Sequence, residues 1–142
     1  MKWISIPKIE ERTVNEDALN VLGNLVALSD GAGGGGVFAD LWSKYLVGQI
    51  TAEPISDFRS FDQWISDIWE AFYNECETKA KHEGGMLLNK FYDEGSCATF
   101  VAVWKISDSC CQWIAYGDSV AFHYNFHTKK LEYSYCSLAD FD

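Results

Sequence analysis

The chain has 142 residues, a length typical of one domain, and we interpret residues 1–142 as a single domain. Hydrophobic residues make up 48% of the sequence and aromatic residues 15%, which excludes an intrinsically disordered chain. The net charge of −10 argues against nucleic acid and membrane surfaces as partners, because both attract clustered Lys and Arg. An acidic chain is suited to binding cations, and it is equally suited to ordinary solubility.

Cysteine usage and hydropathy indicate the compartment. The five cysteines have no regular spacing, which fits neither a C-x-x-C metal site nor the disulfide framework of a secreted domain. The first residues contain no apolar stretch long enough for a signal peptide, and no later stretch reaches transmembrane length. We therefore expect a soluble, cytoplasmic protein with reduced thiols.

The N-terminal part of the chain predicts a hairpin, a glycine loop and a helix. Residues 3–7, "WISIP", alternate as an edge strand does, and residues 17–30 are apolar on both sides of Gly23-Asn24, a pair that tolerates a tight turn. Residues 31–36, "GAGGGG", contain five glycines. The residues that follow place apolar side chains at helical spacing. These side chains are Phe38, Leu41, Trp42, Tyr45 and Leu46.

A longer helix is predicted in the middle of the chain. Residues 51–59 form a loop, and Ser60 with Gln63 has the spacing of a capping box at a helix start. An apolar stripe follows and ends near Gly84-Gly85. The stripe consists of Phe61, Trp64, Ile65, Ile68, Trp69, Phe72 and Cys76. A stripe with so many aromatic residues indicates that the helix packs against a sheet, and it argues against a cofactor site.

The remainder of the chain is rich in β-branched and aromatic residues. Four strand-like segments, "SCATFVAVWKI", "CQWIAY", "SVAFHYNF" and "LEYSYC", are separated by short polar turns. Two helices between runs of antiparallel strands predict an α+β layered domain.

The glycine loop by itself is open to several interpretations. Gly31, Gly33 and Gly36 match the G-x-G-x-x-G fingerprint of dinucleotide-binding proteins. Against this, Asp30 would bring a carboxylate toward the pyrophosphate, and no second strand follows to supply a ribose-binding acid. A Walker loop is excluded because no G-K-[ST] follows the glycines.

A metal site would use Asp30. Hard divalent cations prefer carboxylate and carbonyl oxygens, and a neighbouring glycine allows a backbone carbonyl to approach closely. Glu16 and Asp17 begin the hairpin that Asp30 ends, so the three acids should converge. Arg12 could hold a phosphate as a planar fork. An acidic chain would contain a similar arrangement of acids by chance, so composition does not decide whether a metal site is present.

Four segments, in order across residues 12–122, resemble the metal-dependent protein phosphatases of the 2C type. "RTVNEDA" is similar to that family's R-x-x-x-E-D segment, and "VALSDGAGGGG" to its V-x-D-G-x-G-G segment. "GSCATFVAV" looks like its G-[ST]-x-A strand, and "IAYGDSVAF" like its A-N-x-G-D-S-R-A segment. The resemblance implies an α-β-β-α sandwich of two antiparallel sheets flanked by helices, incomplete at the C-terminus of this chain.

The resemblance also implies a site and an activity. Two Mn²⁺ or Mg²⁺ ions would be held by Glu16, Asp17 and Asp30 with the backbone carbonyl of Gly31, and Asp118 would approach an accessory third ion. Arg12 would bind the phosphate of a phosphoserine or phosphothreonine protein, which a metal-bridging water would attack in line. No nucleophilic side chain would be needed.

The sequence departs from the family's pattern. Ala32 stands where eukaryotic members often have histidine, Val120 follows G-D-S in place of arginine, and the later D-G and D-N segments are not found. We therefore expect the 142 residues alone to lack appreciable phosphatase activity and to self-associate. The alternative function is a catalytically inactive, phosphatase-like binding or regulatory module.

Overall fold

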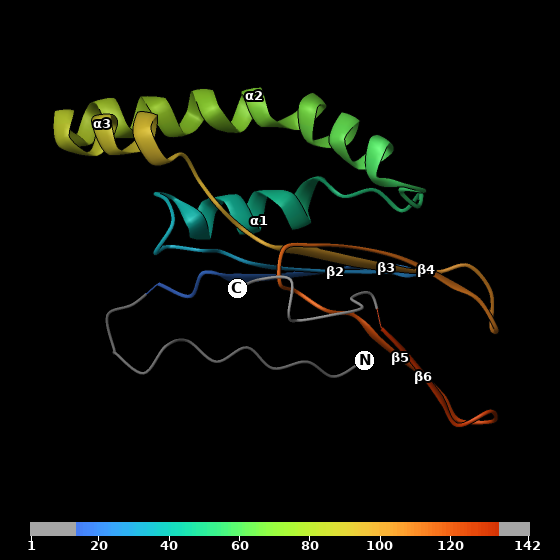
Figure 1. Ribbon diagram of the computed structural model, residues 1–142. Coiled ribbons are helices and arrows are strands. Elements are labelled where there is room, and N and C mark those ends of the chain that lie inside the picture. The colour runs from blue at the N-terminus through green and yellow to red at the C-terminus, as the bar shows by residue number, and fades with distance from the viewer. Residues whose placement is uncertain (1–13, 134–142) are drawn as a thin grey trace.

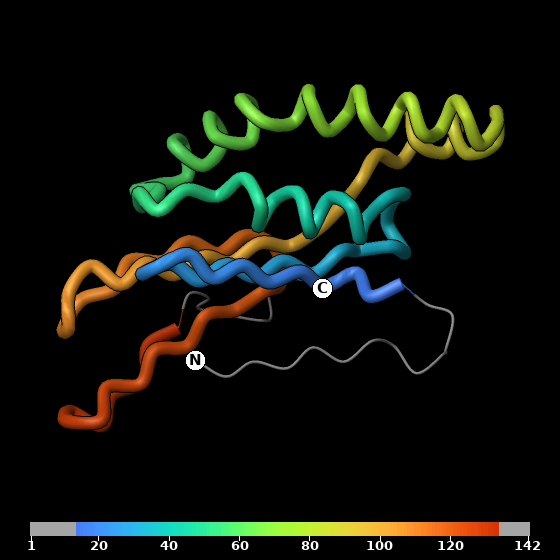
Figure 2. Tube along the Cα trace, turned by 180° about the vertical axis from the view of Figure 1, so that it is seen from behind, coloured from blue at the N-terminus to red at the C-terminus, as the bar shows by residue number. Residues whose placement is uncertain are grey.

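The computed structural model describes residues 14–133, which form an α+β fold (Figure 1). Helices cover one face of a four-stranded antiparallel sheet, and a two-stranded sheet lies on the opposite side, as both Figure 1 and Figure 2 show. The predicted α+β class is confirmed. Arg12 and the strand expected at residues 3–7 lie outside the described residues.

The four-stranded sheet has the order β1-β2-β3-β4, with every pair antiparallel. The two-stranded sheet pairs β5 with β6. The strands are β1 Asp17–Leu22, β2 Leu25–Asp30, β3 Phe100–Lys105, β4 Cys111–Tyr116, β5 Phe122–Asn125 and β6 Lys130–Tyr133. The predicted segments from residue 17 onward therefore each overlap at least one of these strands, and β6 begins one residue before its predicted segment.

The first hairpin forms as its sequence predicts. Gly23 has φ +59°, in the region that favours glycine, and Leu22 pairs with Leu25 across the turn. The side-chain amide of Asn24 donates to the backbone oxygen of Lys105, 2.9 Å away. The turn is thereby tied to the end of β3, which neighbours β2 in the sheet.

Three helices form where the sequence predicted two. They are α1 Ala39–Gln49, α2 Phe58–Glu83 and α3 Gly85–Glu94. The short helix α3 was not expected. It starts directly after Gly84, whose φ of +120° reverses the chain between α2 and α3.

The predicted capping box of Ser60 and Gln63 is wrong. Helix α2 begins one turn earlier, and its N-cap is Asp57, whose carboxylate accepts a hydrogen bond from the backbone N–H of Ser60 at 2.8 Å. The Gln63 amide instead donates to Asp67, one turn along the same helix. Two cap patterns overlapped in the sequence, and the earlier acid satisfies the free amide.

The main core lies between the helices and one face of the sheet. Leu25 and Ala27 of β2 and Phe100 and Trp104 of β3 are at most 1% exposed, and they pack against Leu46 and its neighbours in α1. The intervening side chains point to the other face, since residues alternate along a strand. On that face, Leu28 is 47% exposed. The four-stranded sheet is thus well covered on its helix side only.

Two further observations bear on the sequence expectations. Cys76, Cys97, Cys110 and Cys111 are free thiols, and burial raises the pKa of the Cys76 thiol to about 11. Within residues 14–133, no helix is both long and apolar enough to cross a membrane.

Candidate functional site

The antiparallel sheet gathers several of the predicted site residues at one end. Asp17 starts β1, Asp30 ends β2, Thr99 immediately precedes β3, and Asp118 follows β4 in the next turn. Because neighbouring strands run in opposite directions, the start of one strand lies beside the end of the next. The chain therefore brings residues from four separate segments to the same end of the sheet.

Asp17 and Asp30 lie directly opposite each other in the β1–β2 ladder. Opposed residues in an antiparallel pair have Cα atoms about 4.5–5.5 Å apart, with both side chains on the same face. Both residues are exposed. This face is the one opposite the helices, because the adjacent Ser29 of β2 is buried on the helix side.

Glu16 points to the other side of the strand and over the glycine loop. A Cβ built on Gly33 would lie 1.9 Å from the carboxylate oxygen Oε1 of Glu16. The backbone oxygen of Glu16 accepts from the N–H of Gly31 at 3.1 Å and from the hydroxyl of Ser43 in α1. Glu16 is thus fixed at its backbone, and its carboxylate approaches the loop only because residue 33 has no side chain.

Several loop glycines are required by close backbone packing. A Cβ on Gly31 would lie 2.6 Å from the backbone oxygen of Ala39, and one on Gly36 would lie 2.8 Å from that of Gly95. Real Cβ atoms essentially never approach so closely. By contrast, a Cβ on Gly34 would meet no atom of the described residues within 4 Å.

The amides of the loop are largely used within the protein. The N–H of Ala32 donates to Cys97, that of Gly35 to Ala32, and that of Val37 to Gly95, at 2.8–2.9 Å. The N–H groups of Gly31 and Gly33 also donate to backbone oxygens. A phosphate cradle needs amides that point at the ligand, so this loop does not have the arrangement of a dinucleotide-binding turn. Its glycines allow α1 and the segment before β3 to pack against it.

Thr99 links Asp30 to the turn that carries Asp118. Its N–H donates to the backbone oxygen of Asp30 at 2.8 Å, and its hydroxyl accepts from the Asp30 N–H at 3.3 Å. The same hydroxyl shares a hydrogen bond with Ser119. Gly117, with φ +81°, packs against the Thr99 side chain, where a Cβ would lie 3.0 Å from the methyl carbon.

The structure brings only some of the predicted metal ligands close to one another. In residues 14–133, no group of three or more His, Cys, Asp or Glu side chains is close enough together to hold a metal ion. Asp17 and Asp30 are opposed, Glu16 points toward the glycine loop, and Asp118 is exposed in the adjacent turn. Arg12 lies outside the described residues.

Two residues of this region were missed by the sequence reasoning. Thr99 and Ser43 bond to Asp30 and Glu16, from which they are separated by 69 and 27 positions. Thr99 lies within the "GSCATF" segment, which predicts a strand but not the hydrogen bonds of the Thr99 side chain. Ser43 is fully buried on an otherwise apolar helix face. A single serine among apolar positions of a helix indicates a buried hydroxyl that needs a hydrogen-bond partner, but it does not indicate which partner.

No protein-family model matches the chain, and comparison with curated proteins and with solved structures finds no match.

Proposed function

We propose that the end of the four-stranded sheet binds a divalent cation, Mn²⁺ or Mg²⁺, as part of a metal-dependent protein phosphatase site of the 2C type. The observation that carries the proposal is the direct opposition of Asp17 and Asp30 in the β1–β2 ladder. Gly31 directly follows Asp30, and its backbone carbonyl would be a further oxygen ligand for the ion.

The chemistry of this donor set fits a hard cation. Like charges at directly opposed positions repel, and a cation between them converts the repulsion into attraction. Carboxylates are the ligands that Mg²⁺ and Mn²⁺ prefer, and Mg²⁺ is commonly held by one or two carboxylates while several water molecules complete its coordination. The Gly31 carbonyl already accepts from Gly33 at 3.2 Å, but a carbonyl oxygen has a second lone pair for an ion.

The substrate class comes from the resemblance to the 2C family. Its members act on phosphoserine and phosphothreonine proteins, and Arg12 is the residue here that would bind the phosphate. When bound, two divalent ions would acidify a water molecule and stabilise charge on the phosphoryl oxygens. Asp17 and Asp30 would position the ions, and Thr99 would hold the backbone of Asp30 in place.

The alternative is a phosphatase-like module that binds a cation or a partner protein without catalysis. The incomplete ligand set in the described residues favours this second candidate. Because each ion takes about six oxygen ligands, two opposed carboxylates would leave most positions to water. We expect the 142 residues to bind Mn²⁺ without appreciable turnover of p-nitrophenyl phosphate.

Titration calorimetry of Mn²⁺ into the full chain tests the proposal. Asp30→Asn should remove the binding that the wild type shows, whereas Asp93→Asn, which changes an exposed acid in α3, should leave it intact. Equal Mn²⁺ binding by the wild type and Asp30→Asn would contradict the site. A parallel assay with p-nitrophenyl phosphate separates the candidates, since Mn²⁺-dependent turnover lost in Asp30→Asn would establish the hydrolase.

A further inference from the structure

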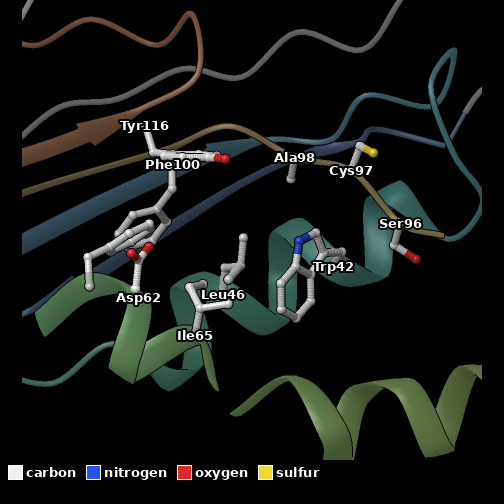
Figure 3. Close-up of a pocket in the computed structure, with 10 residues that line it drawn as sticks. Trp42, Leu46, Asp62, Ile65, Ser96, Cys97, Ala98, Phe100 and Tyr116 are labelled. Atoms are coloured by element: carbon white, nitrogen blue, oxygen red, sulfur yellow. The ribbon is translucent and has the colours of Figure 1, made fainter. Parts of the chain in front are cut away.

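A cavity of about 330 Å³ lies between the helix layer and the sheet, on the face of the sheet opposite the Asp17–Asp30 pair (Figure 3). Side chains from α1, α2, β3, β4 and the segment before β3 line it. Its volume is at the lower end of the range for small-molecule sites. The proposed phosphatase chemistry makes no use of it.

The inner wall of the cavity is apolar and aromatic. Leu46, Phe61 and Phe100 are 2%, 3% and 1% exposed, and the indole of Trp42 stands near Leu46 in Figure 3. The ring of Phe61 lies 5.9 Å from that of Phe100 and 5.6 Å from that of Tyr116, measured between centroids. A ligand entering the cavity would therefore contact aromatic rings and aliphatic carbon.

The rim of the cavity carries a negative charge. Asp62 is an exposed residue of α2 that lines the cavity, and Figure 3 shows its side chain extending from the helix toward the strands. Within residues 14–133, its carboxylate makes no hydrogen bond or ion pair with another residue. Among the described residues that line the cavity, none is Lys, Arg or His. Tyr116, 55% exposed, also stands at the rim.

We propose that this cavity binds a small organic ammonium ion with an apolar body. Aromatic ring faces attract cations electrostatically, and the free carboxylate of Asp62 adds a charge of the complementary sign. The aliphatic or aryl body of the ligand would displace water from the wall formed by Leu46 and Phe100. The chain's net charge of −10 also favours a cation over an anion.

Three ligands with the same aryl body and different head charges test the proposal: benzylammonium, benzyl alcohol and phenylacetate. Binding to the full chain is followed by ¹H–¹⁵N NMR, in which the indole N–H of Trp42 reports directly on the cavity. Benzylammonium should bind most tightly, benzyl alcohol more weakly and phenylacetate most weakly. Absence of shifts at Trp42 with millimolar benzylammonium, or equal affinities for the three ligands, would overturn the proposal.

Asp62→Asn supplies the matched variant, and its site on the helix surface makes the substitution compatible with folding. It should weaken benzylammonium about fivefold while leaving benzyl alcohol unchanged. Glu70→Gln removes the same charge from an exposed position of α2 that does not line the cavity, and should change neither affinity. If both variants weaken benzylammonium equally, the effect is one of net charge and the assigned site is wrong.

Discussion

The carboxylate of Glu16 occupies the space where a side chain on residue 33 would stand, since a Cβ on Gly33 would lie 1.9 Å from its Oε1. Gly33→Ala should therefore displace the Glu16 carboxylate and, because Glu16 directly precedes the proposed ligand Asp17, weaken Mn²⁺ binding roughly tenfold. Stability should change little, because the end of a glutamate side chain can move aside. Calorimetric titration measures the affinity, with Gly34→Ala as the control because a Cβ there meets nothing within 4 Å. Identical Mn²⁺ affinities for Gly33→Ala and Gly34→Ala would show that Glu16 does not contribute to Mn²⁺ binding.

Gly31 and Gly36 face backbone atoms that cannot move aside in the same way. Gly31→Ala would place a Cβ 2.6 Å from the backbone oxygen of Ala39, and Gly36→Ala would place one 2.8 Å from that of Gly95. Each substitution should lower the free energy of unfolding by about 1–3 kcal/mol, because the backbone must shift to relieve the overlap. Urea denaturation provides the measurement. A loss no larger than that of Gly34→Ala would show that the loop is not closely packed.

Thr99 should stabilise both Asp30 and the turn after β4. Thr99→Val keeps the shape of the side chain but removes the hydroxyl that contacts the Asp30 N–H and Ser119. We expect about 1–2 kcal/mol lower stability by urea denaturation, together with amide shifts at residues 30 and 117–119. Thr99→Ser keeps the hydroxyl and should preserve the amide positions. Shifts confined to residue 99 and its strand neighbours would argue against this link.

The Asp57 cap of α2 predicts a specific pH dependence. The hydrogen bond from the Ser60 backbone N–H holds the pKa of Asp57 below its ordinary value of 3.8. A lowered carboxyl pKa stabilises the folded state above the unfolded value, and this contribution disappears as the pH falls through the folded value. Asp57→Ala should therefore be less stable than the wild type at neutral pH.

The stability difference between wild type and Asp57→Ala should remain constant from about pH 7 to pH 5 and decrease below pH 3.8. Thermal unfolding across this range measures it. Asp57→Asn is the control, because its side-chain oxygen can still accept from Ser60 but does not titrate. A difference that grows on acidification would contradict the assigned cap.

Much of the sheet followed from local sequence, whereas the links between segments did not. The hairpin formed as predicted because Gly23 supplies the positive φ of the turn and apolar residues flank the turn on both sides. The opposition of Asp17 and Asp30 then follows from counting outward from that turn. The sequence favoured Ser60 over Asp57 as the cap of α2, because Ser60 and Gln63 have the spacing of a capping box.

The roles of Thr99 and Ser43 could not be predicted in this way. Their partners lie 69 and 27 positions away, and no local pattern specifies which backbone group a hydroxyl will reach once the strands pair. Helix α3 did carry a signal, since Leu87, Leu88 and Phe91 have helical spacing, but the preceding glycines were interpreted as the end of helical structure.

Paramagnetic broadening of amide signals by Mn²⁺ tests the central claim most directly, because it locates the ion. On adding Mn²⁺ below one equivalent, the signals of Asp17, Asp30 and Gly31 should broaden first, followed by those of the turn at Asp118. Asp30→Asn should remove this pattern. Broadening that instead centres on α2, or that is the same in Asp30→Asn, would show that the opposed aspartates do not form a cation site.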